Sequence, residues 1–243
     1  ALASMDLTKA GFPGPKRVFN GEHGYFKLIE NDNYDMTYLQ ENIGKVWMID
    51  QLAHKPFPSG RLTHGLVHAI KDLKLKHGLN KDDIESIECF VPPGVYKLVA
   101  RPIIDNLTTN YSKLCAKFVG ASFMINDHLN IETFTEKKYL NNKDTLNFAK
   151  KITMIKNDKL DQKVITPQKF IITLVNNSKI EINIDHVYGH PKAPLSEKEY
   201  LEKFSKCCFS STNKVDQNQV NRMLDFIFDL ENKDNVIDFF KTI

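Results

Sequence analysis

The segment Lys55–His64, with the sequence KPFPSGRLTH, constrains the fold of this chain more than any other. Pro56 and Pro58 exclude an α-helix there, because each fixes its own φ and biases the preceding residue towards extended geometry. Gly60 then permits a tight backbone path that a side chain would block. The following residues carry apolar side chains at helical spacing, namely Leu66, Ala69, Ile70 and Leu73. We therefore expect a stiff loop that leads into an amphipathic helix over residues 63–77.

This loop concentrates polar and cationic side chains at a helix start, where backbone N–H groups also favour anions. Lys55 offers a point charge that pairs with an anion at little entropic cost, and Arg61 offers a fork that matches a carboxylate. His64 would serve either as a proton donor or as an orienting hydrogen-bond partner. The pattern predicts a receptor for a small polycarboxylate. The alternative is purely structural: a surface lysine beside two prolines, and a histidine satisfied by nearby backbone.

Composition narrows the class of protein. The chain is 42% hydrophobic and 26% charged, which is ordinary for a globular protein, and its net charge of +3 gives no electrostatic argument for nucleic acid. No apolar run approaches the roughly 20 residues of a membrane span, and no secretory segment opens the chain. The cysteines lack the spacing of a disulfide framework or a zinc site: Cys89, Cys115, Cys207 and Cys208. We expect the cytoplasm, or the mitochondrial matrix in a eukaryote, and no metal.

Periodicity predicts an α+β fold. Alternating residues predict a strand over 84–91, and further strands are expected over 152–155, 169–174 and 179–184. A turn at Asn176–Ser178 joins the last two strands. Apolar residues at helical spacing predict helices over 111–125, 144–150, 216–229 and 236–240. Asn80 is expected to cap a second helix, and Ser196 to Glu199 form a capping box. We place an α+β domain at 50–190, flanked by helical parts at 1–49 and 191–243.

The first residues, Ala1–Gly11, are typical of the last turns of an apolar helix that a glycine stops. A natural chain rarely opens inside a buried helix. We therefore expect a segment before Ala1 in the intact protein, either removed, split off or supplied by another chain.

Several motifs follow one another in a recognisable order. They are Gly11–Pro15 with Asn20–Phe26, Lys55–Pro58 with Thr63–His64, Asp144–Ile155, the hairpin around Asn177, and Gly189–Ser196 leading to Lys203–Phe204. In this order the chain resembles the C-terminal half of the MmgE/PrpD family, which includes 2-methylcitrate dehydratases, cis-aconitate decarboxylases and iminodisuccinate epimerases. Each motif alone is weak, but together they extend across nearly the whole chain.

The resemblance implies a subunit with a large all-helical domain and a smaller α+β lid, usually in a homodimer. This chain would supply the lid and the closing C-terminal helices, while the N-terminal half of the helical domain would be missing. Members of the family that resemble this chain place an aspartate, a threonine, histidines and a lysine of the active site in that half. The expected partners are therefore the missing half or a complementary chain, and a second copy.

The resemblance also implies roles for single residues. Lys55 matches the loop lysine that contacts a substrate carboxylate, and His64 matches the histidine that ends the motif. Tyr111 is the candidate for the tyrosine that the lid turns towards the substrate, although it also fits an aromatic residue at a core edge. Gly60 stands where decarboxylase-type members carry a histidine, so decarboxylation of cis-aconitate is less expected. Arg61 would partly compensate for the missing histidine by binding a carboxylate.

The implied activity is a cofactor-independent lyase of propionate metabolism that dehydrates 2-methylcitrate or a related tricarboxylate. Lys55, Arg61 and His64 would fill the cationic and acid roles, and the base would lie in the missing half. Three cysteines at the spacing of iron–sulfur ligands are not present, which disfavours a cluster. Two alternatives stay open: an epimerase, isomerase or decarboxylase of a small di- or tricarboxylate, and a truncated or split homologue without catalytic activity.

Overall fold

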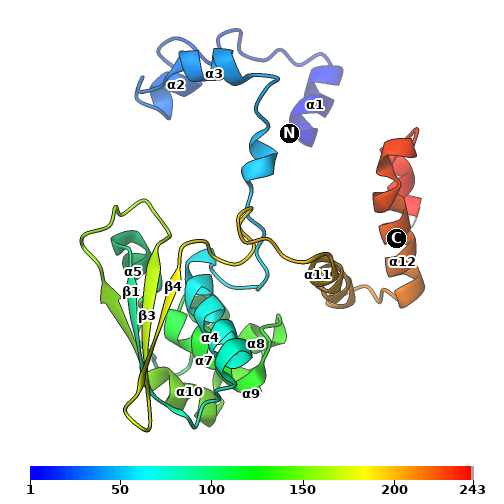
Figure 1. The fold of residues 1–243 in the computed structure, drawn as a ribbon. Coiled ribbons are helices and arrows are strands. Elements are labelled where there is room, and N and C mark those ends of the chain that lie inside the picture. Colours follow the sequence, from blue (N-terminus) through cyan, green and yellow to red (C-terminus); the bar gives the residue numbers. More distant parts are fainter. Residues whose placement is uncertain (242–243) are drawn as a thin grey trace. The chain divides into compact units, whose positions relative to one another are not determined.

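The computed structural model describes residues 1–241, which form two compact units: Ala1–Asp50 and a second unit that begins at Gln51. Figure 1 shows the helices and the sheet, with colours that follow the sequence from the N-terminus to the C-terminus. The sheet has four strands of mixed direction and packs against helices of the same unit. The α+β class predicted from the sequence is confirmed.

The first unit contains three short α-helices, α1 (Leu2–Lys9), α2 (Tyr25–Leu28) and α3 (Met36–Asn42). The 3₁₀-helix η1 (Met48–Gln51) follows them and ends one residue beyond the unit's last residue, Asp50. The helix predicted at the chain start is confirmed, and Gly11 follows it at φ +87°. Among residues 1–50, all of which the structure describes, Gly24 alone is buried. This unit therefore has no apolar core of its own.

The sheet of the second unit has the strand order β2-β1-β3-β4. Its strands are β1 (Ile84–Val91), β2 (Ile152–Lys156), β3 (Gln168–Leu174) and β4 (Lys179–Ile184), each within a residue or so of its predicted range. β1 pairs in parallel with β2 and antiparallel with β3, which in turn pairs antiparallel with β4. Asn177 takes φ +65° in the predicted turn between β3 and β4, a conformation that asparagine tolerates.

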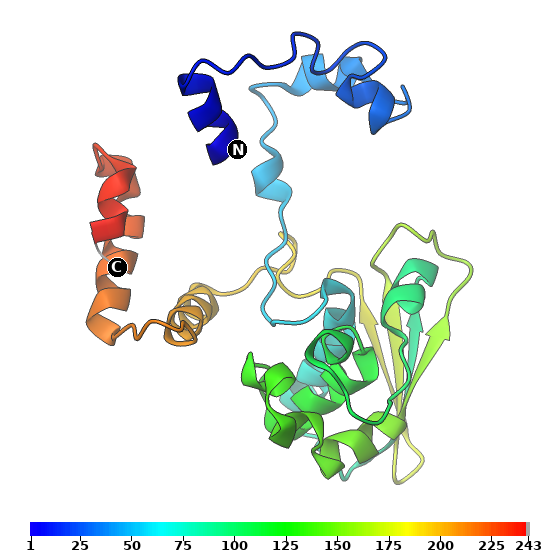
Figure 2. The ribbon, with the colours of Figure 1, turned by 180° about the vertical axis from the view of Figure 1, so that it is seen from behind.

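Helices α4 (His64–His77) and α7 (Ala116–Asn126) lie on the same side of the sheet in both Figure 1 and Figure 2. The remaining helices of this region are η2 (Arg61–Thr63), α5 (Pro93–Val99), α6 (Thr109–Ser112), α8 (Glu132–Thr135), α9 (Lys137–Leu140) and α10 (Lys143–Lys150). The core takes side chains from α4, α7 and the strands, for example Ile70, Leu73, Phe118, Ile87 and Phe170. Burial of each such side chain contributes about 1.5–3 kcal/mol, so this core holds the helices on the sheet.

One predicted element is confirmed only in part, since α7 covers residues 116–125 of the helix expected over 111–125, and one predicted cap is wrong. The helix expected over 111–125 is interrupted, because the carbonyl of Lys113 accepts a hydrogen bond from the Gly60 amide (2.9 Å) and Cys115 takes an extended conformation before α7. Asn80 does not cap a helix either. Its Oδ1 accepts from the Asp82 amide at 2.8 Å in a local turn, and the chain then enters β1. In both places hydrogen bonds outside a helix replace the helical ones.

The chain ends in helices α11 (Glu197–Phe209) and α12 (Gln217–Phe228), followed by the 3₁₀-helices η3 (Leu230–Asn232) and η4 (Val236–Lys241). The capping box predicted at Ser196 is confirmed, and Asp216 forms a second one at the start of α12. Among the described residues, no helix has the length and apolar character that a membrane crossing requires.

Candidate functional site

The proline-containing loop lies where the sequence predicted it, directly before η2 and α4. Backbone hydrogen bonds hold it at both ends: the His54 amide donates to Gly189 O (2.8 Å), and the Gly60 amide donates to Lys113 O (2.9 Å). Between these points Pro56 and Pro58 restrict the backbone. The predicted stiff connection into the helix is therefore present.

Lys55 is exposed and makes no hydrogen bond or ion pair with any described residue. Most other lysines near helix α4 are paired, as Lys71 is with Glu199 and Lys76 with Asp72. The Lys55 ammonium is close enough to His64 to help lower the pKa of that imidazole. It is thus a free cation on a fixed backbone.

Arg61 directs its guanidinium at backbone carbonyls. Its Nη1 donates to Tyr188 O (2.7 Å) and His54 O (3.2 Å), and its Nη2 donates to Val187 O (3.3 Å). Burial lowers the pKa of Arg61. The side chain therefore ties the loop to residues 187–188 and adds positive potential, while two of its nitrogens are already engaged.

His64 is fully buried, and its Nε2 lies 3.0 Å from Ser59 Oγ. Ser59 Oγ lies 3.0 Å from Thr63 Oγ1, which donates to Gly60 O at 2.8 Å. Because each hydroxyl has one proton, all three hydrogen bonds form only if Ser59 donates to Thr63 and His64 donates from Nε2. His64 Nδ1 then carries a lone pair, for which no partner exists among the described residues.

Burial lowers the pKa of His64 to about 3, and the charges of Arg61 and Lys55 add to this effect. The imidazole is therefore neutral at physiological pH. Its Nε2–H is committed to Ser59, and the ring of Phe57 packs edge-on against it, with 5.3 Å between the ring centroids. Of the two roles considered for His64, this geometry fits an orienting hydrogen-bond partner better than a proton donor.

Tyr111 is half-buried, and its hydroxyl donates to Pro102 O at 2.8 Å. The guanidinium of Arg101 lies 5.2 Å from its ring centroid, and burial raises the pKa of its phenol. Tyr111 is two residues from Lys113, whose carbonyl binds the loop. The structure thus brings Lys55, Arg61 and His64 together and connects Tyr111 to them through the backbone.

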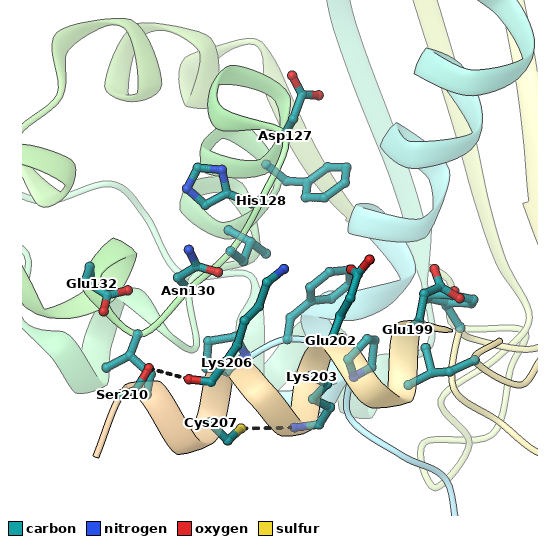
Figure 3. Close-up of a pocket in the computed structure, with 18 of the residues that line it drawn as sticks. Asp127, His128, Asn130, Glu132, Glu199, Glu202, Lys203, Lys206, Cys207 and Ser210 are labelled. Atoms are coloured by element: carbon teal, nitrogen blue, oxygen red, sulfur yellow. Dashed lines mark hydrogen bonds between the residues drawn. The ribbon is translucent and has the colours of Figure 1, made fainter. Parts of the chain in front are cut away.

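A cavity of about 500 Å³ lies beside the loop. Pro56, Phe57 and Pro58 form part of its wall, and residues 127–132 and α11 supply most of the rest. Figure 3 shows Lys203, Lys206 and Cys207 along α11, with Asp127 and His128 on the part that follows α7. None of Lys55, Arg61, His64 and Tyr111 lines this cavity.

Sequence reasoning missed a cluster at the edge of this cavity. Lys71 Nζ lies 3.0 Å from Glu199 Oε1 and 4.1 Å from the ring centroid of Tyr188. Burial alone would raise the pKa of Glu199, but hydrogen bonds from Tyr188, Ser196 and Lys71 bring it to about 2. Glu199 is therefore ionised at physiological pH. The capping box marked Glu199, but no sequence signal linked it to Lys71, which is 128 residues away.

Among residues 1–241, no group of three or more His, Cys, Asp and Glu side chains is arranged to hold a metal ion. The loop itself carries a free ammonium, a half-buried guanidinium and a neutral imidazole. Such an arrangement attracts a small anion and orients it.

Comparisons with known proteins agree with the motifs. The model of the MmgE/PrpD C-terminal domain matches residues 57–226. The cis-aconitate decarboxylase of Mus musculus is 24% identical over 214 residues, and that of Homo sapiens is 25% identical over 207 residues. Each alignment covers 82% of this chain and 41% of the relative. The chain thus spans about two fifths of the length of these curated relatives.

Proposed function

Because this chain belongs to the MmgE/PrpD family, we propose that it is the loop-bearing part of a lyase that acts on a small tricarboxylate. The observation that carries this proposal is Lys55, an unpaired ammonium on a fixed loop next to the positive potential of Arg61. A fixed cation binds a carboxylate with little loss of conformational entropy, and it also stabilises charge that develops on that carboxylate.

We propose dehydration of 2-methylcitrate or a close analogue as the reaction. A base removes a proton beside a carboxylate, and an acid protonates the departing hydroxyl. In this scheme Lys55 binds a substrate carboxylate, while Arg61 contributes positive potential without direct contact. His64 keeps the loop in shape through Ser59. The base and the acid come from parts of the family fold that this chain does not cover.

A second candidate is decarboxylation of cis-aconitate, which the names of both relatives favour. Gly60 argues against it, because this position offers no imidazole for proton transfer. A Cβ added at Gly60 would lie 2.5 Å from Leu114 Cδ2, so the space for a side chain here is already taken by leucine. The dehydration proposal does not need a side chain at this position.

Turnover by the complete protein separates the two reactions. Incubation with 2-methylcitrate should give rising ultraviolet absorbance from an unsaturated product, and incubation with cis-aconitate should release little carbon dioxide. Lys55→Gln should reduce kcat/KM by at least about tenfold, whereas Lys214→Gln, at an exposed lysine remote in sequence, should not change it. Carbon dioxide release without absorbance gain would favour decarboxylation, and no turnover of either acid would reject the proposal.

A further inference from the structure

His54, the residue before Lys55, is held on three sides. Its amide donates to Gly189 O (2.8 Å), and its carbonyl accepts from Arg61 Nη1 (3.2 Å). Its ring Nδ1 lies 2.9 Å from Tyr200 Oη. Residue 189 and Tyr200 are far from the loop in sequence, so the start of the loop depends on contacts that only the folded unit provides.

Gly189 makes a very close backbone contact with His54. It takes φ +86°, and a Cβ added there would lie 2.2 Å from His54 O and 3.3 Å from Pro56 Cδ. The two backbones are therefore in direct contact. The His54 side chain, in contrast, is exposed, and Tyr200 is the hydrogen-bond partner that the structure gives to its ring.

Tyr200 lies on the first turn of α11, next to Glu199. Glu199 is bonded to Lys71 of α4 and caps its own helix through Ser196, so this turn is fixed on the core. The Tyr200 ring meets the His54 ring edge-on, with 4.9 Å between centroids and 86° between planes. A continuous set of contacts thus runs from α4 through Glu199 and Tyr200 to His54.

We propose that Tyr200 is a positioning residue for Lys55. Its hydroxyl holds the His54 side chain and so limits the region that the Lys55 ammonium samples. Loss of this hydrogen bond leaves Lys55 chemically intact but less well ordered, which weakens carboxylate binding more than it changes the chemical step. This inference rests on the proposed function, because it takes Lys55 as the group that binds the substrate.

A double-mutant cycle on the complete protein tests the coupling. Tyr200→Phe should raise KM about fivefold, which corresponds to the free energy of one hydrogen bond. The kcat of this variant should stay within about twofold of the wild-type value. In a Lys55→Gln background the same change should alter KM by less than twofold. Tyr96→Phe is the matched control, because its hydroxyl makes no hydrogen bond with any described residue. An unchanged KM in Tyr200→Phe, or an equal effect in both backgrounds, would overturn the proposal.

Amide hydrogen exchange in the same proteins separates this proposal from the proposed function. The His54 amide should exchange about fivefold faster in Tyr200→Phe than in the wild-type protein, whatever the substrate is. Faster exchange together with no turnover of any tricarboxylate would support the anchoring and reject the proposed function. Unchanged exchange would reject the positioning role even if the enzyme is active.

Discussion

At the scale of single residues, the charges of the side chains on the loop determine the electrostatic potential that the loop presents to an anion. The Lys55 side chain is exposed, and Arg61 is half-buried, where burial lowers its pKa and its guanidinium donates to backbone carbonyls. His64 is neutral because it is fully buried next to both cations. The two cations thus present a positive potential to an anion, while His64 contributes only its hydrogen bond to Ser59.

The neutral state of His64 predicts acid sensitivity. Its pKa is about 3 in the folded protein and about 6.5 in the unfolded chain, so only the unfolded chain takes up this proton between those values. Stability from this group is complete above pH 6.5 and falls as the pH decreases towards 3. Between pH 7 and pH 5 the loss is about 2 kcal/mol.

Urea unfolding at the two pH values checks this prediction. His64→Gln should lose about 2 kcal/mol less than the wild-type protein between pH 7 and pH 5. The exposed His128 provides the control, since His128→Gln should keep the wild-type loss. Equal losses in all three proteins would contradict a neutral, buried His64.

Gly189 gives a second prediction at this scale. Gly189→Ala places a Cβ against the His54 carbonyl and imposes φ +86° on alanine, and both effects destabilise the fold. We expect a loss of at least about 2 kcal/mol in unfolding free energy by denaturant titration. Gly78→Ala, in the same unit, also sits at a positive φ, +66°, but would meet no atom within 4 Å, so it should cost less. A Gly189→Ala loss no larger than that of Gly78→Ala would argue against the contact.

At the scale of elements, local signals predicted most of the structure, and long-range contacts explain the misses. Proline chemistry predicted the loop, and side-chain alternation predicted β1, because both depend on neighbouring residues. The break between α6 and α7 depends on a hydrogen bond from Gly60, and two of the three carbonyls that Arg61 binds lie more than 120 residues away. For the candidate site, sequence therefore identified the cations but not what each of them contacts.

The first turn of α11 is the element whose order the site requires. Ser196→Ala removes one half of its capping box, which typically costs about 1 kcal/mol. We expect amide exchange within α11 to rise about fivefold, with α4 unchanged. Ser210→Ala, which removes only a bond to Lys206 O near the other end of α11, should have a smaller effect on that first turn. Equal exchange in both variants would contradict the role given to the cap.

At the scale of the whole molecule, apolar burial is uneven. The second unit holds every residue of the hydrophobic core, while large side chains such as Phe12, Phe19, Trp47 and Ile49 in the first unit are exposed. The helices of the first unit, at most eight residues long, are shorter than the roughly 12–15 residues that isolated helices need. Those exposed side chains fit the proposal that this unit belongs to a larger helical domain.

This contrast predicts different behaviour of the two units when they are expressed separately. Residues 51–241 should unfold in one cooperative urea transition, because they contain the core. Residues 1–50 should show weak helical circular dichroism and a gradual loss of signal. A cooperative transition of residues 1–50 alone would contradict the view that they lack a core.

The central claim is that Lys55, on its fixed loop, receives a carboxylate of a small anion. Calorimetric titration of the complete protein with a tricarboxylate tests it most directly, because it requires no turnover. We predict that Lys55→Gln raises Kd at least about tenfold at low ionic strength, and that the Lys214→Gln control leaves Kd unchanged. Equal Kd values for the wild-type protein and Lys55→Gln would contradict the claim.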